Sequence, residues 1–248
     1  MKTTERHHLK DNELAMALNQ AQGWLTANQR TLLVTLAAIA VIGGGVAAYA
    51  AWKGRIDNQA RTLLAGAMVI EEARVMPPAP PAGTTNDPTA LGGQLPNTYP
   101  TEKAKLEAAL PKFVAAADAY PASESGILAR YHAATILVSL GRFDEALKQY
   151  DQVIAAGSGV VARTARLGKA EAQLRAGQYD PAIATFKELA GQKDGSLPPE
   201  ALLFELARAY RLAGKTDDAR KTLNQIVEQH AESQFATEAK AELAKMKG

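Results

Sequence analysis

The sequence predicts an all-α protein, in which a single N-terminal transmembrane helix is followed by a solenoid of stacked helical hairpins. Alanine dominates the 47% of residues that are hydrophobic and only 6% are aromatic, which is a helical composition. An uncharged run of 22 residues lies near the N-terminus, and a short pattern recurs later at intervals of 36 and 37 residues. Intervals of that size are typical of stacked hairpins, because one hairpin cannot bury its apolar face alone.

The first segment, residues 1–30, predicts a polar tail and an amphipathic helix. Residues 1–10 are polar, and the adjacent His7 and His8 lack the further ligands that a metal site needs. From Asp11 to Arg30 apolar residues recur at helical spacing. This pattern predicts a helix that either lies on a membrane surface or leads into the next segment.

Residues 31–52 predict the transmembrane helix. They carry no charge, and as a helix they reach roughly 33 Å, enough to cross a hydrocarbon core of about 30 Å. Tyr49 and Trp52 at one end suit the lipid interface. The triplet Ala48-Tyr49-Ala50 resembles a signal-peptidase site, but the long leader and long apolar run favour an uncleaved anchor over a signal peptide or a buried core helix.

Small residues mark one face of this helix. Gly43, Gly44, Ala47 and Ala48 give the small-xxx-small spacing on which membrane helices pack closely. The spacing predicts a packing face for a partner or for a second copy of the chain, which would make a homo-oligomer. The alternative is that lipid simply tolerates these glycines.

Residues 53–75 continue the helical pattern and predict a stalk, whereas residues 76–100 are rich in proline and predict a linker. The linker is interpreted as a spacer, with a binding loop as the alternative. Residues 101–248 then predict the repeat domain. Its first helix begins near Thr101, and Pro111 is expected to kink or break it.

The recurring pattern runs from Leu140 to Leu147, from Ala176 to Ile183 and from Ala213 to Arg220. In each copy a glycine can end one helix in a left-handed conformation, and a following aspartate suits the start of the next helix. The pattern predicts hairpins over residues 125–156, 161–191 and 199–229. A final helix over 234–247, apolar on one face and charged on the other, is expected to cap the array.

These hairpins resemble tetratricopeptide repeats. The small residues of that family match Ala134, Ala170 and Ala207 in the first helices, and Ala146, Ala182 and Ala219 in the second. The family's first-helix aromatic is replaced here by Arg130, Arg166 and Leu203. The resemblance implies noncatalytic binding of proteins or peptide segments on the concave face formed by the first helices.

The family's geometry also implies which residues line that face. They are a mixture of aromatic, aliphatic and charged side chains, which suits an extended or helical peptide held by apolar anchors and arginine-carboxylate pairs. The alternative for Leu167 and Phe204 is packing inside the array. The predicted binding residues are Tyr131, Thr135, Val138, Leu167, Glu171, Leu174, Arg175, Phe204, Arg208 and Arg211.

No pattern for catalysis or for a cofactor appears. The chain has no cysteine, and Gly214-Lys215-Thr216 lacks the earlier glycine of a phosphate-binding loop. The paired acids Asp144-Glu145 and Asp217-Asp218 stand at helix starts, where electrostatics explain them. A net charge of +2 gives no argument for a nucleic-acid partner. The sequence predicts no enzyme, no metal and no cofactor.

The layout of the chain resembles the membrane-anchored ancillary subunit of the bacterial Sec translocon. That resemblance implies the bacterial inner membrane, a cytoplasmic N-terminus, periplasmic repeats, and translocon subunits and periplasmic chaperones as partners in handling exported proteins. Arg30 before the membrane helix and Lys53, Arg55 and Arg61 after it mildly favour the opposite orientation. The alternative function is a scaffold subunit of a cell-envelope assembly complex.

Overall fold

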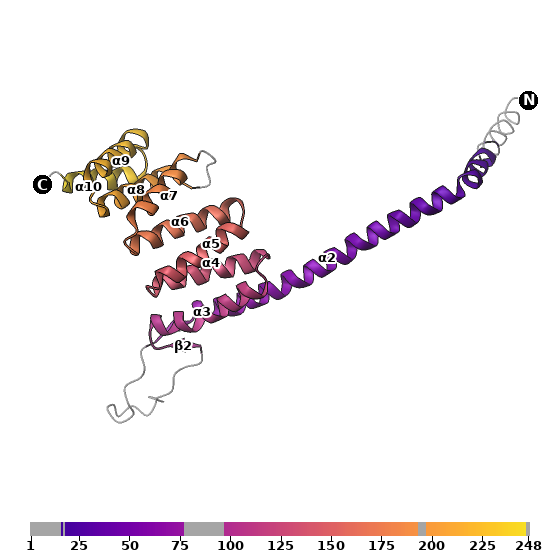
Figure 1. Cartoon of the computed structure of the whole chain (residues 1–248), viewed down its shortest axis with the longest axis horizontal. Helices are drawn as coiled ribbons and strands as arrows, with labels where there is room; N and C mark the ends of the chain where they lie inside the picture. The colour runs from indigo at the N-terminus through magenta and orange to yellow at the C-terminus, as the bar shows by residue number, and fades with distance from the viewer. Residues whose placement is uncertain (1–15, 17, 77–96, 193–196, 247–248) are drawn as a thin grey trace, which may run out of the picture. The chain divides into compact units, whose positions relative to one another are not determined.

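The computed structural model describes residues 16, 18–76, 97–192 and 197–246. Two compact units divide the chain, residues 1–55 and residues 56–248. Residues 18–27 are helical. The remaining elements are α2 (Gln29–Glu71), β1 (Arg74–Val75), β2 (Thr98–Tyr99), α3 (Glu102–Ala119), α4 (Glu124–Ser139), α5 (Phe143–Ala156), α6 (Gly159–Arg175), α7 (Tyr179–Gly191), α8 (Pro199–Leu212), α9 (Thr216–Gln229) and α10 (Gln234–Lys245) (Figure 1). The all-α prediction is confirmed.

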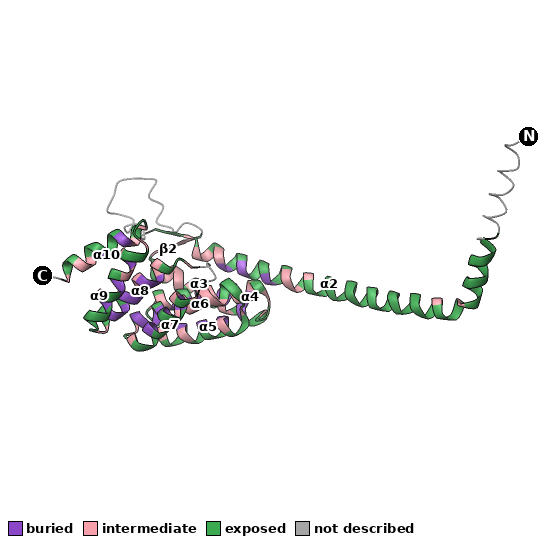
Figure 2. Cartoon of the chain, turned by 90° about the horizontal axis from the view of Figure 1, so that it is seen from above, coloured by how far each residue is buried: buried purple, intermediate pink, exposed green. Residues whose placement is uncertain are grey.

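In the first unit, the apolar residues of α2 lie on the surface. Leu36, Ile39, Val41 and Val46 are each more than half exposed, and no described residue from 31 to 55 is buried (Figure 2). Within the described part of the chain, α2 is the one helix that is long enough and apolar enough to cross a membrane. The histidines His7 and His8 lie outside the described residues.

The second unit contains the three predicted hairpins, formed by α4 with α5, α6 with α7, and α8 with α9. Each turn follows one geometry. Gly141, Gly177 and Gly214 have φ of 75°, 75° and 74°, the left-handed conformation that glycine adopts without steric cost. In the first turn the Gly141 amide donates to the Val138 carbonyl at 3.1 Å, and the next amide donates to the Leu137 carbonyl at 2.8 Å. This pair of bonds satisfies carbonyls that the helix end would otherwise leave free.

The predicted aspartates lie in the first turn of each second helix, at Asp144, Asp180, Asp217 and Asp218. None of these helices has a side-chain cap. The carboxylates therefore act through the positive end of the helix dipole.

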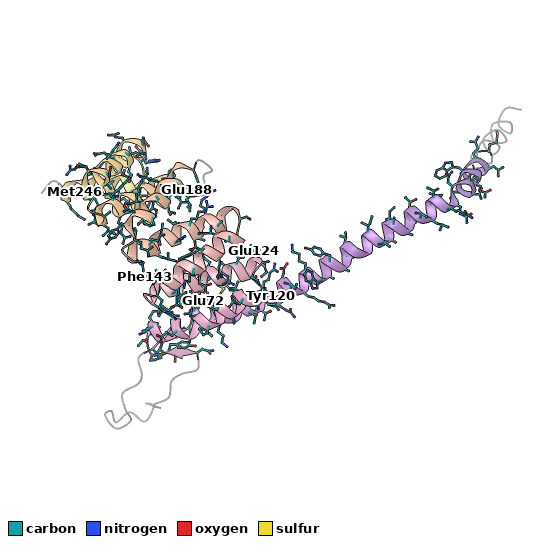
Figure 3. The ribbon with its side chains drawn as sticks, viewed as in Figure 1. Glu72, Tyr120, Glu124, Phe143, Glu188 and Met246 are labelled. Atoms are coloured by element: carbon teal, nitrogen blue, oxygen red, sulfur yellow. The ribbon has the colours of Figure 1, made fainter. Side chains whose placement is uncertain are left out.

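The predicted stalk and the helix after the linker pack together in the second unit. Leu64 and Ala67 of α2 are buried in one cluster with Leu110 and Phe113 of α3. The Tyr120 hydroxyl, labelled in Figure 3, donates to the Gln59 side chain at 2.9 Å. Through these contacts α3 pairs with residues 56–71 of α2, which gives a further helical pair at the start of the array.

Strands β1 and β2 hold together the two ends of the predicted linker. They pair in parallel, with Arg74 opposite Thr98 and Val75 opposite Tyr99. The Met76 amide also donates to the Tyr99 carbonyl at 2.9 Å. Residues 77–96, which hold six of the seven prolines of the predicted linker, lie outside the described residues.

Helix α3 is continuous through Pro111, so the expected break is wrong. Proline removes a single N–H donor from the helix, and the neighbouring Leu110 and Phe113 are buried in the core. The burial of these side chains outweighs one lost hydrogen bond.

A candidate protein-binding face

The first helices of the three hairpins, α4, α6 and α8, together with α10 form one surface, which we call the inner face. Helix α4 contacts α6, and α8 contacts α10. Small buried residues, Ala134, Ala170 and Ala207, allow each first helix to approach its neighbours closely. The predicted binding residues lie on α4, α6 and α8, at positions one repeat apart.

Exposure divides the predicted binding residues into three groups. Thr135, Glu171, Arg175, Arg208 and Arg211 are exposed. Tyr131, Val138, Leu167 and Phe204 are partly buried, and Leu167 and Phe204 pack against the core of the array. Leu174 is only 6% exposed and belongs to that core. Most of the hydrophobic members therefore pack within the array, and the accessible chemistry is largely polar and charged.

Two tyrosines lie at the α4 end of the inner face, Tyr131 on α4 and the buried Tyr150 beneath it on α5. The rings of Tyr131 and Tyr150 meet edge to face with centroids 5.8 Å apart, and the Tyr150 hydroxyl lies 3.5 Å from the Thr135 hydroxyl. Burial raises the pKa of Tyr150 to about 12. The Tyr150 ring fits because Gly168 faces it, where a Cβ would come within 2.7 Å of the phenol oxygen.

Charged side chains surround a first cavity between α6 and α8. Its volume is about 140 Å³, and it is lined by Glu171, Leu174, Arg175, Arg208 and Leu212. Glu171 is exposed as a whole residue, but its neighbours partly desolvate its carboxyl group. This desolvation, and then the negative charge of Glu205, raise the pKa of Glu171, whereas Arg175 and Arg208 act in the opposite direction. The cavity therefore holds charges of both signs.

A second cavity, of about 90 Å³, lies where α8, α9 and α10 meet. It is lined by Phe204, Ala207, Arg208, Arg211, Ala219, Leu223 and Glu242. Because Arg208 lines both cavities, they are neighbours on the inner face. Sequence reasoning missed Leu212, Leu223 and Glu242; the last was expected on the charged outer side of the final helix.

A larger hollow of about 660 Å³ is lined by residues of α9 alone, such as Asp217 and Lys221. One helix cannot surround a ligand, so this hollow is a weaker candidate. Among the described residues, no group of three or more His, Cys, Asp or Glu could hold a metal ion.

The predicted packing face of α2 is accessible. Gly43, Gly44, Ala47 and Ala48 are all exposed, and a Cβ built at Gly43 or Gly44 would meet nothing within 4 Å. This face stays a prediction.

Comparisons with known proteins agree with the geometry. Residues 131–197 and residues 200–233 match family models described as Tetratricopeptide repeat. Two solved structures of TPR-like repeats, from a Podosopora anserina protein assigned as a kinesin light chain and from a point variant of it, are similar in fold. Each is 19% identical, with a TM-score of 0.51 over 57% of this chain and 77% of that chain. No curated protein matches the sequence.

Proposed function

We propose that this tetratricopeptide-repeat protein is a membrane-anchored adaptor that binds other proteins, without catalysis, on its inner face. The observation that supports the proposal best is the pair of adjoining cavities that share Arg208. They combine apolar surface with arginine side chains, the combination that recurs at peptide-binding surfaces. Tetratricopeptide repeats suggest protein partners, and neither matched family model is catalytic.

Helix α2 supports the membrane part of the proposal. Its apolar side chains are exposed in the first unit, and water would make this exposure unfavourable at about 25 cal/mol per Å² of apolar surface. A lipid bilayer would remove that cost.

The inner-face proposal is tested by reversing two charges. We expect Arg208→Glu together with Arg211→Glu to reduce partner recovery in cross-linking and affinity purification of the full chain. The matched control is Lys112→Glu with Lys148→Glu, because these lysines are exposed on α3 and α5, away from the inner face and the cavities. Equal recovery from both double variants, with unchanged helicity, would refute binding on the inner face.

We also propose that the partners are found on the export side of a bacterial inner membrane, beside the Sec translocon and periplasmic chaperones. Support comes from the layout alone, in which one apolar helix precedes the repeats. A reporter active only outside the cytoplasm is fused after Gly248, and a reporter active only inside it is fused to a parallel copy. A cytoplasmic C-terminus would contradict this assignment, although the adaptor function itself would stand.

The second candidate function is a scaffold subunit of a cell-envelope assembly complex. It is favoured by the exposed small residues Gly44 and Ala48 on α2. Replacing both by leucine should dissociate the complex on native gels, because the larger side chains keep a neighbouring helix at a distance. Intact complexes would reject an interface at this face.

A further inference from the structure

We infer that α10 completes a pocket for one side chain on the inner face, and that the peptide bound there carries a bulky aliphatic or aromatic residue flanked by aspartate or glutamate. The inference rests on the proposed adaptor function and adds the chemistry of the partner. It assigns to the final helix a role in recognition, beyond closing the end of the array.

The size of the cavity between α8, α9 and α10 limits its occupant. At about 90 Å³ it is well below the roughly 300–1,000 Å³ of sites for small-molecule ligands and cofactors. Its floor is apolar, formed by Ala207, Ala219 and Leu223, which are 2%, 0% and 3% exposed. A single apolar side chain fits such a space better than a charged group, because burying an unpaired charge is costly.

Helix α10 forms one wall of this pocket. Glu242 of α10 lines it directly. Phe235 of the same helix contacts Phe204 of α8, with ring centroids 5.7 Å apart, and so fixes a second lining residue. The cavity between α6 and α8 has fewer apolar lining residues, Leu174 and Leu212 only, and is the poorer site for an apolar side chain.

The charges at the rim favour acidic neighbours for the bound side chain. Glu242 accepts a hydrogen bond from Lys245 at 2.7 Å, and Glu205 lies 3.3 Å from Arg208, so both carboxylates already have cationic partners. The side chains of Arg175 and Arg211 make no ion pair or hydrogen bond with the described residues. At longer range Arg175 interacts with Glu171 and Tyr150, and Arg211 interacts with Glu242.

Glu171 is the one acidic group of the two linings without an ion pair among the described residues. It lies in the first cavity, together with Arg175 and Arg208. The pocket beside α10 also has one glutamate and two arginines, Glu242 with Arg208 and Arg211, but Glu242 is already paired with Lys245. A carboxylate of a peptide anchored in that pocket would therefore meet the guanidinium of Arg211, because Arg208 is already paired with Glu205, and a guanidinium binds a carboxylate with two hydrogen bonds.

The test uses the full chain in phosphatidylcholine nanodiscs and a phage library of random dodecapeptides, with empty nanodiscs as the control. We expect the enriched peptides to share one Leu, Ile, Met or Phe within two positions of Asp or Glu. For the strongest peptide, changing the apolar residue to alanine should weaken binding about tenfold in fluorescence anisotropy, as expected for an anchor residue.

A double-mutant cycle then locates the contact. Arg211→Gln and an Asp→Asn or Glu→Gln change in the peptide should each weaken binding several-fold, and together no more than either alone. Lys148→Gln, on the exposed side of α5, is the matched control and should leave binding unchanged. Independent effects of the protein and peptide changes would overturn the assignment of Arg211 to the peptide carboxylate.

Two outcomes separate this inference from the proposed function. Enriched peptides without the acidic-apolar pattern, or peptides whose binding depends on Tyr131 but not on Arg211, would overturn the pocket and leave inner-face binding in place. No enrichment above empty nanodiscs would overturn the peptide chemistry, whereas the adaptor function is decided by the charge-reversal recovery of cellular partners.

Discussion

The apolar residues of α2 and those of the repeat array have opposite environments. Leu36 and Val41 of α2 are 61% and 74% exposed, whereas Phe186 and Ile226 of the array are fully buried. The array buries its own apolar side chains, because each hairpin covers its neighbour. No described residue of the first unit buries residues 31–52. The difference indicates that contacts within the chain stabilise the array, whereas they do not bury the apolar residues of α2 in the first unit.

The largest difference in the stability of the array should come from truncating one large apolar side chain in each region. Phe186→Ala should lower the free energy of unfolding of the array by about 3–5 kcal/mol, because it leaves a cavity in a closed core. Leu36→Ala should leave the unfolding of the array unchanged. Thermal unfolding of the full chain in detergent micelles, followed by circular dichroism, measures both; similar losses would erase the contrast.

A charge inside the apolar run of α2 should release the chain from membranes. Ile42→Arg places a cation near the middle of residues 31–52, at a cost of roughly 2.5–3.5 kcal/mol for membrane insertion. Fractionation with carbonate extraction should then recover more protein in the soluble fraction, with Ile42→Leu as the control. Full membrane retention of Ile42→Arg would argue against a spanning helix.

Buried tyrosine makes the array sensitive to alkali. The pKa of Tyr150 is about 12 in the folded array, above the usual value of 10.0, so its hydroxyl ionises first in the unfolded chain. The neutral Tyr150 hydroxyl therefore stabilises the folded array fully below pH 10, and this contribution is lost as the pH rises from 10 towards 12. Denaturant titrations should show a steeper loss over this range for the wild type than for Tyr150→Phe. Equal slopes would mean that Tyr150 ionises freely.

Glycine replacement should give the smallest contrast. Gly177→Ala should destabilise the array by about 1–2 kcal/mol, because its φ of 75° is unfavourable for residues with a Cβ. Gly44→Ala should not affect array stability, because a Cβ there meets nothing within 4 Å. Denaturant midpoints of the two variants test this, and an unaffected Gly177→Ala would show that the turn can relax.

The hairpins could be predicted from the sequence because their signals are local. The glycine that ends each first helix and the alanines that allow close packing recur at fixed spacing, and the predicted ranges agree with α4 to α9 within two residues. The replacement of the family's aromatic by Arg130 did not disturb this agreement. Arg130 is buried, and its guanidinium lies 2.8 Å from Asp118, which compensates the charge.

The first helical pair could not be predicted in this way. Gln59 and Tyr120 are far apart in sequence, and the proline-rich segment between them interrupts any repeat. His132 of α4 likewise contacts Glu71 at 3.0 Å and stacks on Phe113, contacts that only the folded array reveals. The pocket beside α10 could not be predicted either, because the charged residues of a terminal helix, Glu242 among them, are expected to face solvent.

The pairing of β1 with β2 has a consequence for changes in chain length between them, which we expect the fold to tolerate. The two strands bring the chain back to the place that it left, with Val75 opposite Tyr99. Doubling the number of residues between two fixed chain ends costs only about 0.6 kcal/mol in closure entropy. This position can therefore gain or lose residues, or accept a whole inserted domain whose ends lie close together, while α2 and α3 keep their packing.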